Sequence, residues 1–214
     1  MHSVKELVGG LLCDGMIDAI TKDVPTHIAN TGLKPLITAE EVMDLASQLS
    51  TAGTRRVEIF REGKYIYKNG RRAKVDAKKL NALREKALLR VNYLHQGVPI
   101  FQELCGTLGE ILAAEVRVNA YLSSSHYRGF GFHPDSHDIL VWQQQGRKLW
   151  RVKDGNNKRI VVNTMLCVSG AVYVPVQHHH DPQAQGVESL HLTFGVTSPC
   201  READRVRKRL LELW

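Results

Sequence analysis

The sequence has few cysteines and no long apolar run. Its four cysteines, Cys13, Cys105, Cys167 and Cys200, are scattered and form no CxxC pair. This distribution argues against a zinc ribbon, a redox dithiol or a disulfide-stapled fold, and it suits a reducing cytoplasm. No stretch approaches the roughly 18 apolar residues of a membrane helix, and no basic segment followed by an apolar run opens the chain. We therefore expect a cytoplasmic protein without a membrane span.

Low-complexity segments and internal repeats are also absent. With 214 residues, 43% of them hydrophobic and 24% charged, the chain has the composition of a globular domain that can bury a core. Its formal charge is +7, and thirteen Lys/Arg against four Asp/Glu lie between Arg55 and Arg90. This basic segment, residues 55–90, is either a solvated surface or a docking face for a ribosomal, RNA-rich or other acidic partner.

The first 114 residues are predicted to be mixed helix, hairpin and loop. Thr38-Ala39-Glu40-Glu41 is a capping box, and apolar residues at helical spacing follow it. Strand-type residues meet an Asn69-Gly70 turn, which indicates a hairpin. The remaining elements predicted here are a helix capped by Asp76, a strand over Leu88–Leu94 and a helix opened by Pro99.

From Glu115 onward, short strands alternate with turn residues, which is typical of a sandwich or barrel. We predict strands at Glu115–Leu122, Asp138–Gln144, Lys148–Val152, Arg159–Val162, Ala171–Pro175 and Ser189–Gly195. A closing helix, Arg201–Trp214, carries an apolar stripe that must pack on the domain or on a second copy of the chain. A homodimer through that stripe is therefore expected.

Several polar residues in this half could carry chemistry. On the predicted strand 115–122, Asn119 and Tyr121 share the face opposite the apolar one. His133 and Asp135 are spaced so that both can bind one ion, and the run 178–180 offers three histidines for a third ligand. Two histidines and a carboxylate leave positions open for a chelating cosubstrate and dioxygen, as in non-haem Fe(II) oxygenases. Lys148 could pair with a carboxylate of that cosubstrate.

The order of these motifs resembles that of the ribosomal oxygenases, which are Jumonji-C/cupin-like enzymes. The similar stretches are VNAYL from Val118, GFGFHPDSHD from Gly129, GRKLWRV from Gly146, VYVP before His180, and SLHLT from Ser189. In the family the second metal histidine lies five residues after the proline of the VYVP-like motif. This count selects His180 from the histidine run.

The resemblance implies a mainly β protein with flanking helices, a double-stranded β-helix or jelly roll. It implies that His133, Asp135 and His180 bind Fe(II), and that Lys148, Asn119, Tyr121 and His191 contact 2-oxoglutarate. The implied activity is hydroxylation of an arginine- or histidine-type side chain of a protein or peptide, with O2 and 2-oxoglutarate consumed. The oxygenase domain would span residues 1–200, with a helical part at 1–114 and a β-helix core at 115–197, followed by the helix at 198–214.

Two departures from the family pattern concern the substrate. Ser169-Gly170-Ala171 replaces the usual P-G-D turn, and no segment after the closing helix corresponds to the family's dimerisation helices and winged helix. A hydroxylase that tailors a peptide natural product therefore competes with a ribosomal one, and lysine demethylation is a further variant. A non-catalytic cupin module and a cupin with another divalent metal are the alternatives from other classes.

Overall fold

The computed structural model describes residues 2–52, 56–61, 64–65, 77–125, 127 and 129–213. The strands are β1 (Thr26–Ile28), β2 (Val57–Arg61), β3 (Lys64–Tyr65), β4 (Leu88–Val91), β5 (Glu115–Ser123), β6 (Asp138–Gln145), β7 (Arg147–Lys153), β8 (Ile160–Cys167), β9 (Ala171–Val174), β10 (His180–Ala184) and β11 (Ser189–Thr197). The helices are α1 (Val4–Leu11), α2 (Asp14–Lys22), α3 (Ala39–Thr51), α4 (Ala77–Arg84), α5 (Pro99–Leu112), α6 (Ala203–Glu212) and a short 3-10 helix, η1 (Leu94–Gln96).

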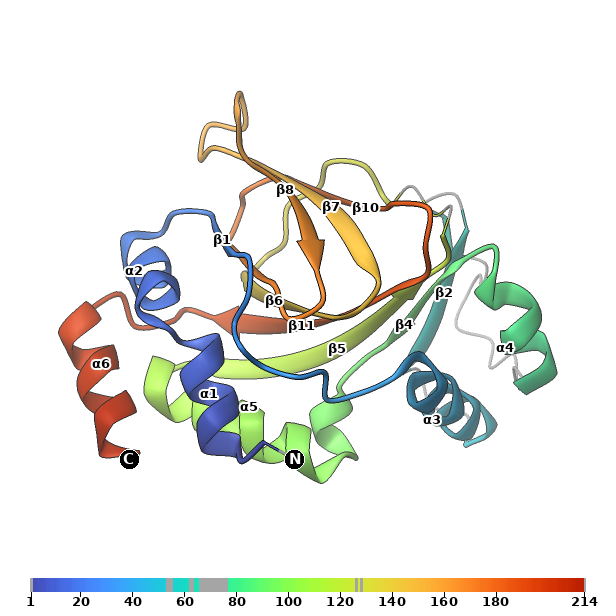
Figure 1. The fold of residues 1–214 in the computed structure, drawn as a ribbon, viewed down its shortest axis with the longest axis horizontal. Helices are drawn as coiled ribbons and strands as arrows, with labels where there is room; N and C mark the ends of the chain where they lie inside the picture. The colour runs from blue at the N-terminus through green and yellow to red at the C-terminus, as the bar shows by residue number, and fades with distance from the viewer. Residues whose placement is uncertain are drawn as a thin grey trace.

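Two antiparallel sheets form the centre of the molecule. The larger sheet has the order β1-β9-β6-β11-β5-β4-β2-β3, and the smaller has the order β10-β7-β8. The smaller sheet lies over one face of the larger, and the helices cover the opposite face (Figure 1). The predicted class, mainly β with flanking helices, is confirmed.

Strand alternation divides the apolar residues between two cores. On β6, Leu140 and Trp142 join the core beneath the helices, whereas Ile139 and Val141 join the core between the sheets. Successive side chains of a strand point to opposite faces, so one strand serves both layers. Trp150 of β7 belongs to the inner core. A space between the sheets beside this inner core is therefore enclosed by β-structure on two sides.

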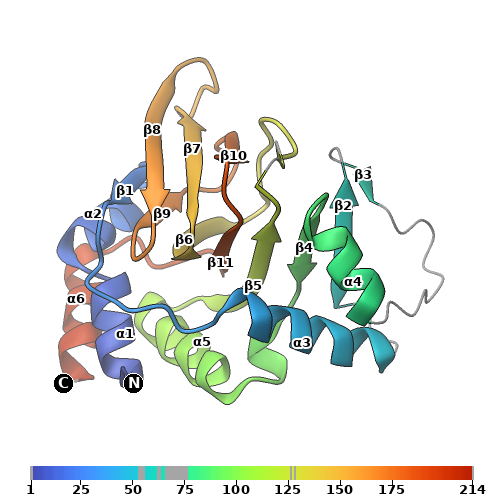
Figure 2. The same ribbon diagram turned by 45° about the vertical axis from the view of Figure 1, so that its right-hand side comes forward.

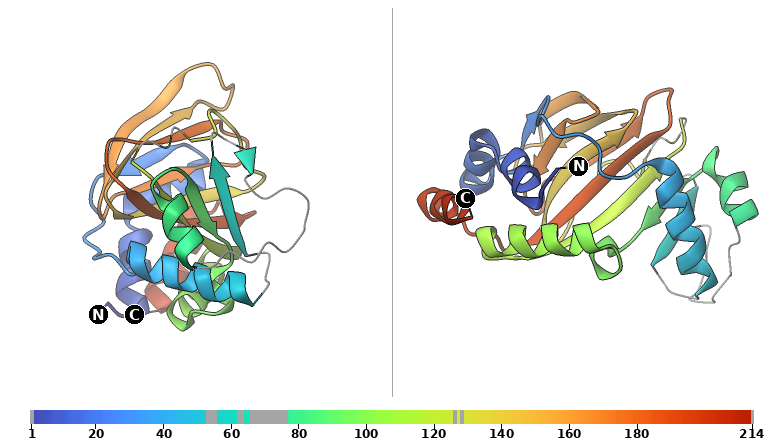
Figure 3. Two further views of the ribbon diagram at one scale, coloured as in Figure 1. Left: turned by 90° about the vertical axis from the view of Figure 1, so that its right-hand side faces the viewer. Right: turned by 60° about the horizontal axis from the view of Figure 1, so that its bottom comes forward.

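Helices α3 and α5 begin where the sequence predicts. The Thr38 hydroxyl accepts a hydrogen bond from the Glu41 N–H at 3.2 Å, and the Glu41 carboxylate accepts one from the Thr38 N–H at 2.8 Å, which is the predicted capping box. Helix α5 begins at Pro99 and lies along the outer face of the larger sheet beneath β5 (Figure 2; Figure 3). None of the described helices is long and apolar enough to cross a membrane.

Some predicted boundaries are wrong. The strand expected over Leu88–Leu94 ends at Val91, because Tyr93 adopts a left-handed conformation (φ 57°) and η1 follows. Strand β8 continues to Cys167, and β10 was not predicted at all. The Asn69-Gly70 turn and Asp76 lie outside the described residues. In the same region β2 pairs with β3, with Phe60 opposite Tyr65, so the described hairpin precedes the predicted turn.

The closing helix α6 packs within the chain. Val206 is fully buried, and Leu210 and Leu213 pack against the same core as the other helices. The stripe was expected to pack either on the domain or on a second copy of the chain. Its described residues pack on the domain. The homodimer stays a prediction, without support from this stripe.

Part of the basic segment is neutralised internally. Arg84 pairs with Glu188 of the loop before β11 and, at 2.9 Å, with Glu40 of α3. Arg90 pairs with Glu58 on the neighbouring strand. These arginines fix elements to one another, so among the described residues a docking face in 55–90 would depend on exposed basic side chains such as Arg61 and Lys78.

A buried carboxylate connects the sheet to the last helix. Asp138, at the start of β6, is 1% exposed and accepts hydrogen bonds from the Tyr173 hydroxyl at 2.6 Å and the Val176 N–H at 2.8 Å. Arg201 pairs with the same carboxylate at 2.8 Å and with Asp23 of the α2 C-terminus at 2.7 Å. Four chain segments therefore converge on Asp138, three residues after Asp135.

We predict that Asp138→Asn destabilises the protein, because it removes the charge that Arg201 and the buried hydroxyl contact. Hydrogen bonds to charged groups contribute roughly 1.5–3 kcal/mol, so urea unfolding should show a loss of about that size. Glu103→Gln, at an exposed position of α5, is the control and should change stability by less than about 0.5 kcal/mol. Equal effects of the two substitutions would contradict this account of the network.

Candidate active site

Two backbone hydrogen bonds hold His133 and His180 side by side. His133 lies in the loop before β6, and His180 opens β10; the two form an isolated antiparallel bridge. The His133 N–H donates to the His180 carbonyl at 3.1 Å, and the His180 N–H donates to the His133 carbonyl at 3.0 Å. Residues paired in this way direct their side chains to the same side. Their ring centroids are 4.5 Å apart.

The Nδ1 atom of each imidazole lies within hydrogen-bond distance of a backbone carbonyl oxygen. His133 Nδ1 lies 2.9 Å from the Gly131 oxygen, and His180 Nδ1 lies 3.2 Å from the His178 oxygen. A carbonyl can only accept, so in the neutral rings Nδ1 carries the proton and Nε2 keeps its lone pair. This arrangement is typical of metal-binding histidines. Burial, followed by repulsion from the neighbouring imidazole, lowers the pKa of His133 and favours the neutral form.

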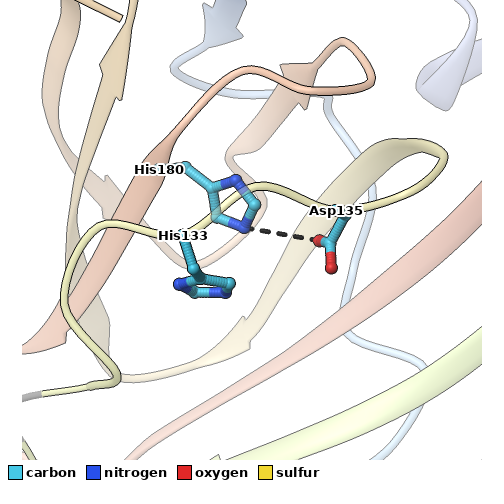
Figure 4. A group of neighbouring side chains, drawn as sticks. All are labelled: His133, Asp135 and His180. Atoms are coloured by element: carbon cyan, nitrogen blue, oxygen red, sulfur yellow. Dashed lines mark ion pairs between the residues drawn. The ribbon is translucent and has the colours of Figure 1, made fainter.

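Asp135 completes a group of three potential ligands. Its Oδ2 lies 3.4 Å from His180 Nε2, and its backbone oxygen accepts from the Gln177 N–H at 3.2 Å. Burial opposes ionisation, but the contact with His180 and the nearby imidazoles outweigh it, so the pKa of Asp135 is below its usual value. One ligand atom from each of the three residues lies within 4.8 Å of the other two. Figure 4 shows the three side chains converging. Two imidazoles and a carboxylate fit an Fe(II) ion.

The other two histidines of the run do not join this group. His178 Nδ1 lies 3.3 Å from the Val176 oxygen, and the His179 N–H donates to the Asn157 side chain at 2.9 Å. Neither His178 nor His179 lines the cavity described below. Among the three candidates, the geometry favours His180.

Lys148 is a buried cation on β7. Its side chain donates to the Ser123 hydroxyl at 2.7 Å and lies 3.2 Å from His191 Nδ1, and the residue is 2% exposed. No carboxylate within the described ranges forms an ion pair with it. Burial lowers the pKa of Lys148 to about 7. A buried ammonium without a counter-charge is unfavourable, so this position suits a group that receives an anion.

A cavity of about 340 Å³ joins these groups. His133, Asp135, His180, Lys148, Tyr121 and His191 all line it, together with Phe60, Leu88, Arg90, Ser123, Tyr127, Gly129, Phe130, Ile139, Trp150, Pro182 and Thr193. Tyr121 stacks on His191 with ring centroids 5.0 Å apart. The volume is within the range of small-molecule sites. A candidate metal position and a candidate anion position therefore share one enclosed space.

Comparisons with known proteins agree with this geometry. The JmjC domain family matches residues 95–169. This part of the chain is therefore similar to a JmjC domain. It is 30% identical to rat (Rattus norvegicus) ribosomal oxygenase 1 over 115 residues, 45% of this chain and 19% of that protein. Over 125 residues, 49% of this chain and 18% of the relative, it is 28% identical to the Brugia malayi bifunctional lysine-specific demethylase and histidyl-hydroxylase NO66. The chain thus spans about a fifth of the length of these curated relatives.

Solved structures show the same fold. The Escherichia coli ribosomal oxygenase YcfD aligns with a TM-score of 0.61 at 16% identity, over 89% of this chain and 63% of that chain. A structure of YcfD in complex with cobalt and 2-oxoglutarate aligns with a TM-score of 0.58 at 18% identity, over 87% of this chain and 53% of that chain. At this identity the likeness concerns the fold, and the predicted Jumonji-C/cupin fold is confirmed.

One residue expected to contact 2-oxoglutarate has a backbone partner in this structure. Asn119 is not among the cavity-lining residues in the described part of the chain. Its Oδ1 instead accepts a hydrogen bond at 2.9 Å from the N–H of Tyr93, the residue with the left-handed conformation. The contact of Asn119 with 2-oxoglutarate therefore stays a prediction, and in this structure its side chain accepts from the backbone ahead of η1. Tyr121 and His191 do line the cavity, as predicted.

Sequence reasoning missed several residues that line the cavity. Ser123 and Trp150 follow Tyr121 and Lys148 by two residues, so strand alternation could have identified both. Phe130 and the residues from β2 and β4 gave no such signal. They reach the cavity only because a loop and the far end of the larger sheet meet there.

Gly129 permits the loop that carries His133 to lie against β10. Its φ of 79° is in the left-handed region, and a Cβ there would lie 2.5 Å from the Pro182 carbonyl oxygen. Gly131 has a similar φ of 73°, but a Cβ there would meet nothing within 4 Å. The two glycines share a backbone requirement and differ in the space around them.

We predict that Gly129→Ala weakens metal binding much more than Gly131→Ala does. Both changes carry the left-handed strain of about 1–2 kcal/mol, but only the first pushes the loop off β10 and separates His133 from His180. Calorimetric titration with zinc should show at least about a tenfold difference in affinity between the variants, or about 1.4 kcal/mol. Equal affinities would show that the close approach at Gly129 does not maintain the site.

Proposed function

We propose that this chain is an Fe(II)- and 2-oxoglutarate-dependent oxygenase that hydroxylates a side chain of a protein or peptide. The observation that carries the proposal is the shared cavity, lined by the three potential metal ligands and by the buried Lys148. The JmjC domain and the relatives named as oxygenases and a histidyl-hydroxylase support it.

His133, Asp135 and His180 would hold the iron. When bound, Fe(II) with dioxygen supplies oxidative decarboxylation of 2-oxoglutarate to succinate and CO2, coupled to insertion of one oxygen into a substrate C–H bond. The protein prepares these ligands through the backbone bridge and the carbonyl contacts of both Nδ1 atoms. Preorganised ligands lose little freedom when the ion binds.

Lys148 would bind the distal carboxylate of 2-oxoglutarate. Ser123 and His191 already orient its ammonium group, and Tyr121 fixes the His191 ring by stacking. Trp150 closes this end of the cavity, since its ring lies near both His180 and His191, with centroids 6.0 and 5.6 Å away. Water is thereby excluded from the contact between ammonium and carboxylate, which strengthens that contact.

The substrate belongs to the proposal as well. The resemblance to ribosomal oxygenases points to an arginine- or histidine-type side chain of a ribosomal protein, and a biosynthetic peptide is the alternative. An acidic or ribosomal partner would contact exposed lysines of residues 55–90. We place the protein in the cytoplasm on the distribution of its cysteines. A non-catalytic binding module is disfavoured, because it would gain nothing from burying an unpaired Lys148.

We predict that His133→Ala, Asp135→Ala and His180→Ala each abolish iron-dependent succinate formation from 2-oxoglutarate, because each removes one of only three protein ligands. His178→Ala and His179→Ala are matched controls from the same run and should retain metal binding and turnover. Succinate can be quantified by mass spectrometry, and the metal by titration. Loss of metal binding in His179→Ala with retention in His180→Ala would overturn the ligand assignment.

We further predict that 2-oxoglutarate binding weakens as pH rises above 7. Below that value Lys148 is already protonated in the free protein, so affinity should not depend on its titration. Above it, binding must be accompanied by uptake of one proton, and affinity should fall by up to about tenfold per pH unit. Calorimetry of the zinc-loaded protein between about pH 6.5 and 8.5, in buffers of different ionisation enthalpy, measures both affinity and proton uptake.

Lys148→Met and Lys153→Met are the variants for this test. Without the charge-assisted contact, Lys148→Met should bind 2-oxoglutarate about ten- to a hundredfold more weakly at pH 6.5 and show no such pH dependence. Lys153 lies on the same strand but contacts Phe132 outside the cavity, so its replacement should change neither property. Unchanged affinity in Lys148→Met would refute the anchor.

A further inference from the structure

An aromatic cluster lies between the metal ligands and β2. We define it as Phe60, Tyr127 and Phe130, which all line the cavity. Phe130 makes edge-to-face contacts with Phe60, at a centroid distance of 4.8 Å, and with His133, at 5.6 Å. Phe130 also lies 6.0 Å from Tyr127. The cluster therefore extends from a metal ligand toward β2.

Different side-chain contacts connect this cluster and Lys148 to the metal ligands. Lys148 is reached from His180 through Trp150 and His191, whereas the aromatic cluster is reached from His133 through Phe130. Once 2-oxoglutarate is bound to Lys148, the part of the cavity that remains beside the ligands is the aromatic part. A substrate side chain would contact this cluster, so the inference depends on the proposed function.

The Arg90 side chain places a positive charge beside the aromatic cluster. The Arg90 guanidinium lies 5.2 Å from the centre of the Phe60 ring and 5.9 Å from that of Tyr121. Glu58 accepts hydrogen bonds from Arg90 and, at 2.8 Å, from the Asn92 amide, so its carboxylate is already engaged. Arg90 lines the cavity, but Glu58 does not.

The only acidic side chain among the described cavity-lining residues is Asp135. A metal ion would engage that carboxylate. A guanidinium or ammonium group entering the aromatic end would therefore find no free carboxylate in the described lining, and would come near Arg90. An isolated charge transferred into such a site is strongly disfavoured, whereas an apolar group gains by leaving water.

We propose that the aromatic cluster binds an uncharged side chain of the substrate, aromatic or aliphatic, and that Arg90 excludes arginine and lysine. Neutral histidine satisfies this requirement, and arginine does not. Phe130 acts as a specificity residue through ring contact, and Arg90 acts through its charge.

The test uses full-length, zinc-loaded protein saturated with 2-oxoglutarate, so that no turnover occurs. The probes are the N-acetyl methylamides of phenylalanine, leucine and arginine, and their binding is measured by ligand-observed NMR. The phenylalanine and leucine derivatives should bind at least tenfold more tightly than the arginine derivative. Arginine binding equal to or tighter than that of phenylalanine overturns the proposal.

Two variants assign the effect to residues. Phe130→Ala should lose at least tenfold in affinity for the phenylalanine derivative, whereas Phe132→Ala should not, because Phe132 contacts Arg151 and Lys153 outside the cavity. Arg90→Met should bind the arginine derivative at least tenfold more tightly than the parent protein does, since the cation that repels the probe is removed from the cavity lining. If the affinity of Phe130→Ala or of Arg90→Met for its probe is unchanged, the role assigned to that residue is wrong.

Failure of this inference can be told apart from failure of the proposed function. Binding of 2-oxoglutarate by the zinc-loaded protein, and its conversion to succinate by the iron-loaded protein, are measured separately for each variant. Folding of each variant is verified by its thermal unfolding curve. If a variant does not fold, the comparison of the three probes on the parent protein still decides the selectivity.

Discussion

The two hydrogen bonds between the backbones of His133 and His180 are the constraint on which the site depends. They join a loop of the larger sheet to the edge strand of the smaller one and direct both imidazoles to one side. Asp135 is placed by the same loop. The backbone contact needs a glycine at position 129, where no side chain could fit against Pro182. The main chain therefore fixes the relative positions of the two candidate metal-binding histidines.

The remainder of the fold supports this contact from outside. Asp138 draws together β6, β9, the segment before α6 and the end of α2 only three residues beyond Asp135. The outer core beneath the helices keeps the larger sheet in place, and the inner core joins the two sheets. Rigid elements on both sides hold the loop ligands at short distance.

Two basic side chains, Lys148 and Arg90, line the cavity in different surroundings. At one end a buried ammonium has hydroxyl and imidazole neighbours and, within the described ranges, no carboxylate partner. At the other end the Arg90 guanidinium pairs with Glu58 and lies over the ring of Phe60. The first end is suited to receive an anion, and the second is suited to an uncharged group. Under the proposed function, the first environment would hold the cosubstrate and the second the substrate.

The sequence by itself determined the helices and strands that neighbouring residues specify. It also identified His133 and Asp135 as candidate ligands, because they lie two residues apart. The capping box at Thr38, the helix opened by Pro99 and the alternation on β5, which puts Tyr121 on the cavity side, all follow from neighbouring residues. Only the tertiary structure decided the rest. Strand β10 forms because β7 pairs with it, although its residues His-Asp-Pro-Gln-Ala have little intrinsic preference for a strand. The Asn119 side chain accepts a hydrogen bond from the Tyr93 backbone, and Phe130 and Arg90 line one cavity from separate segments. Such contacts join residues far apart in the chain, and local sequence patterns carry no information about them.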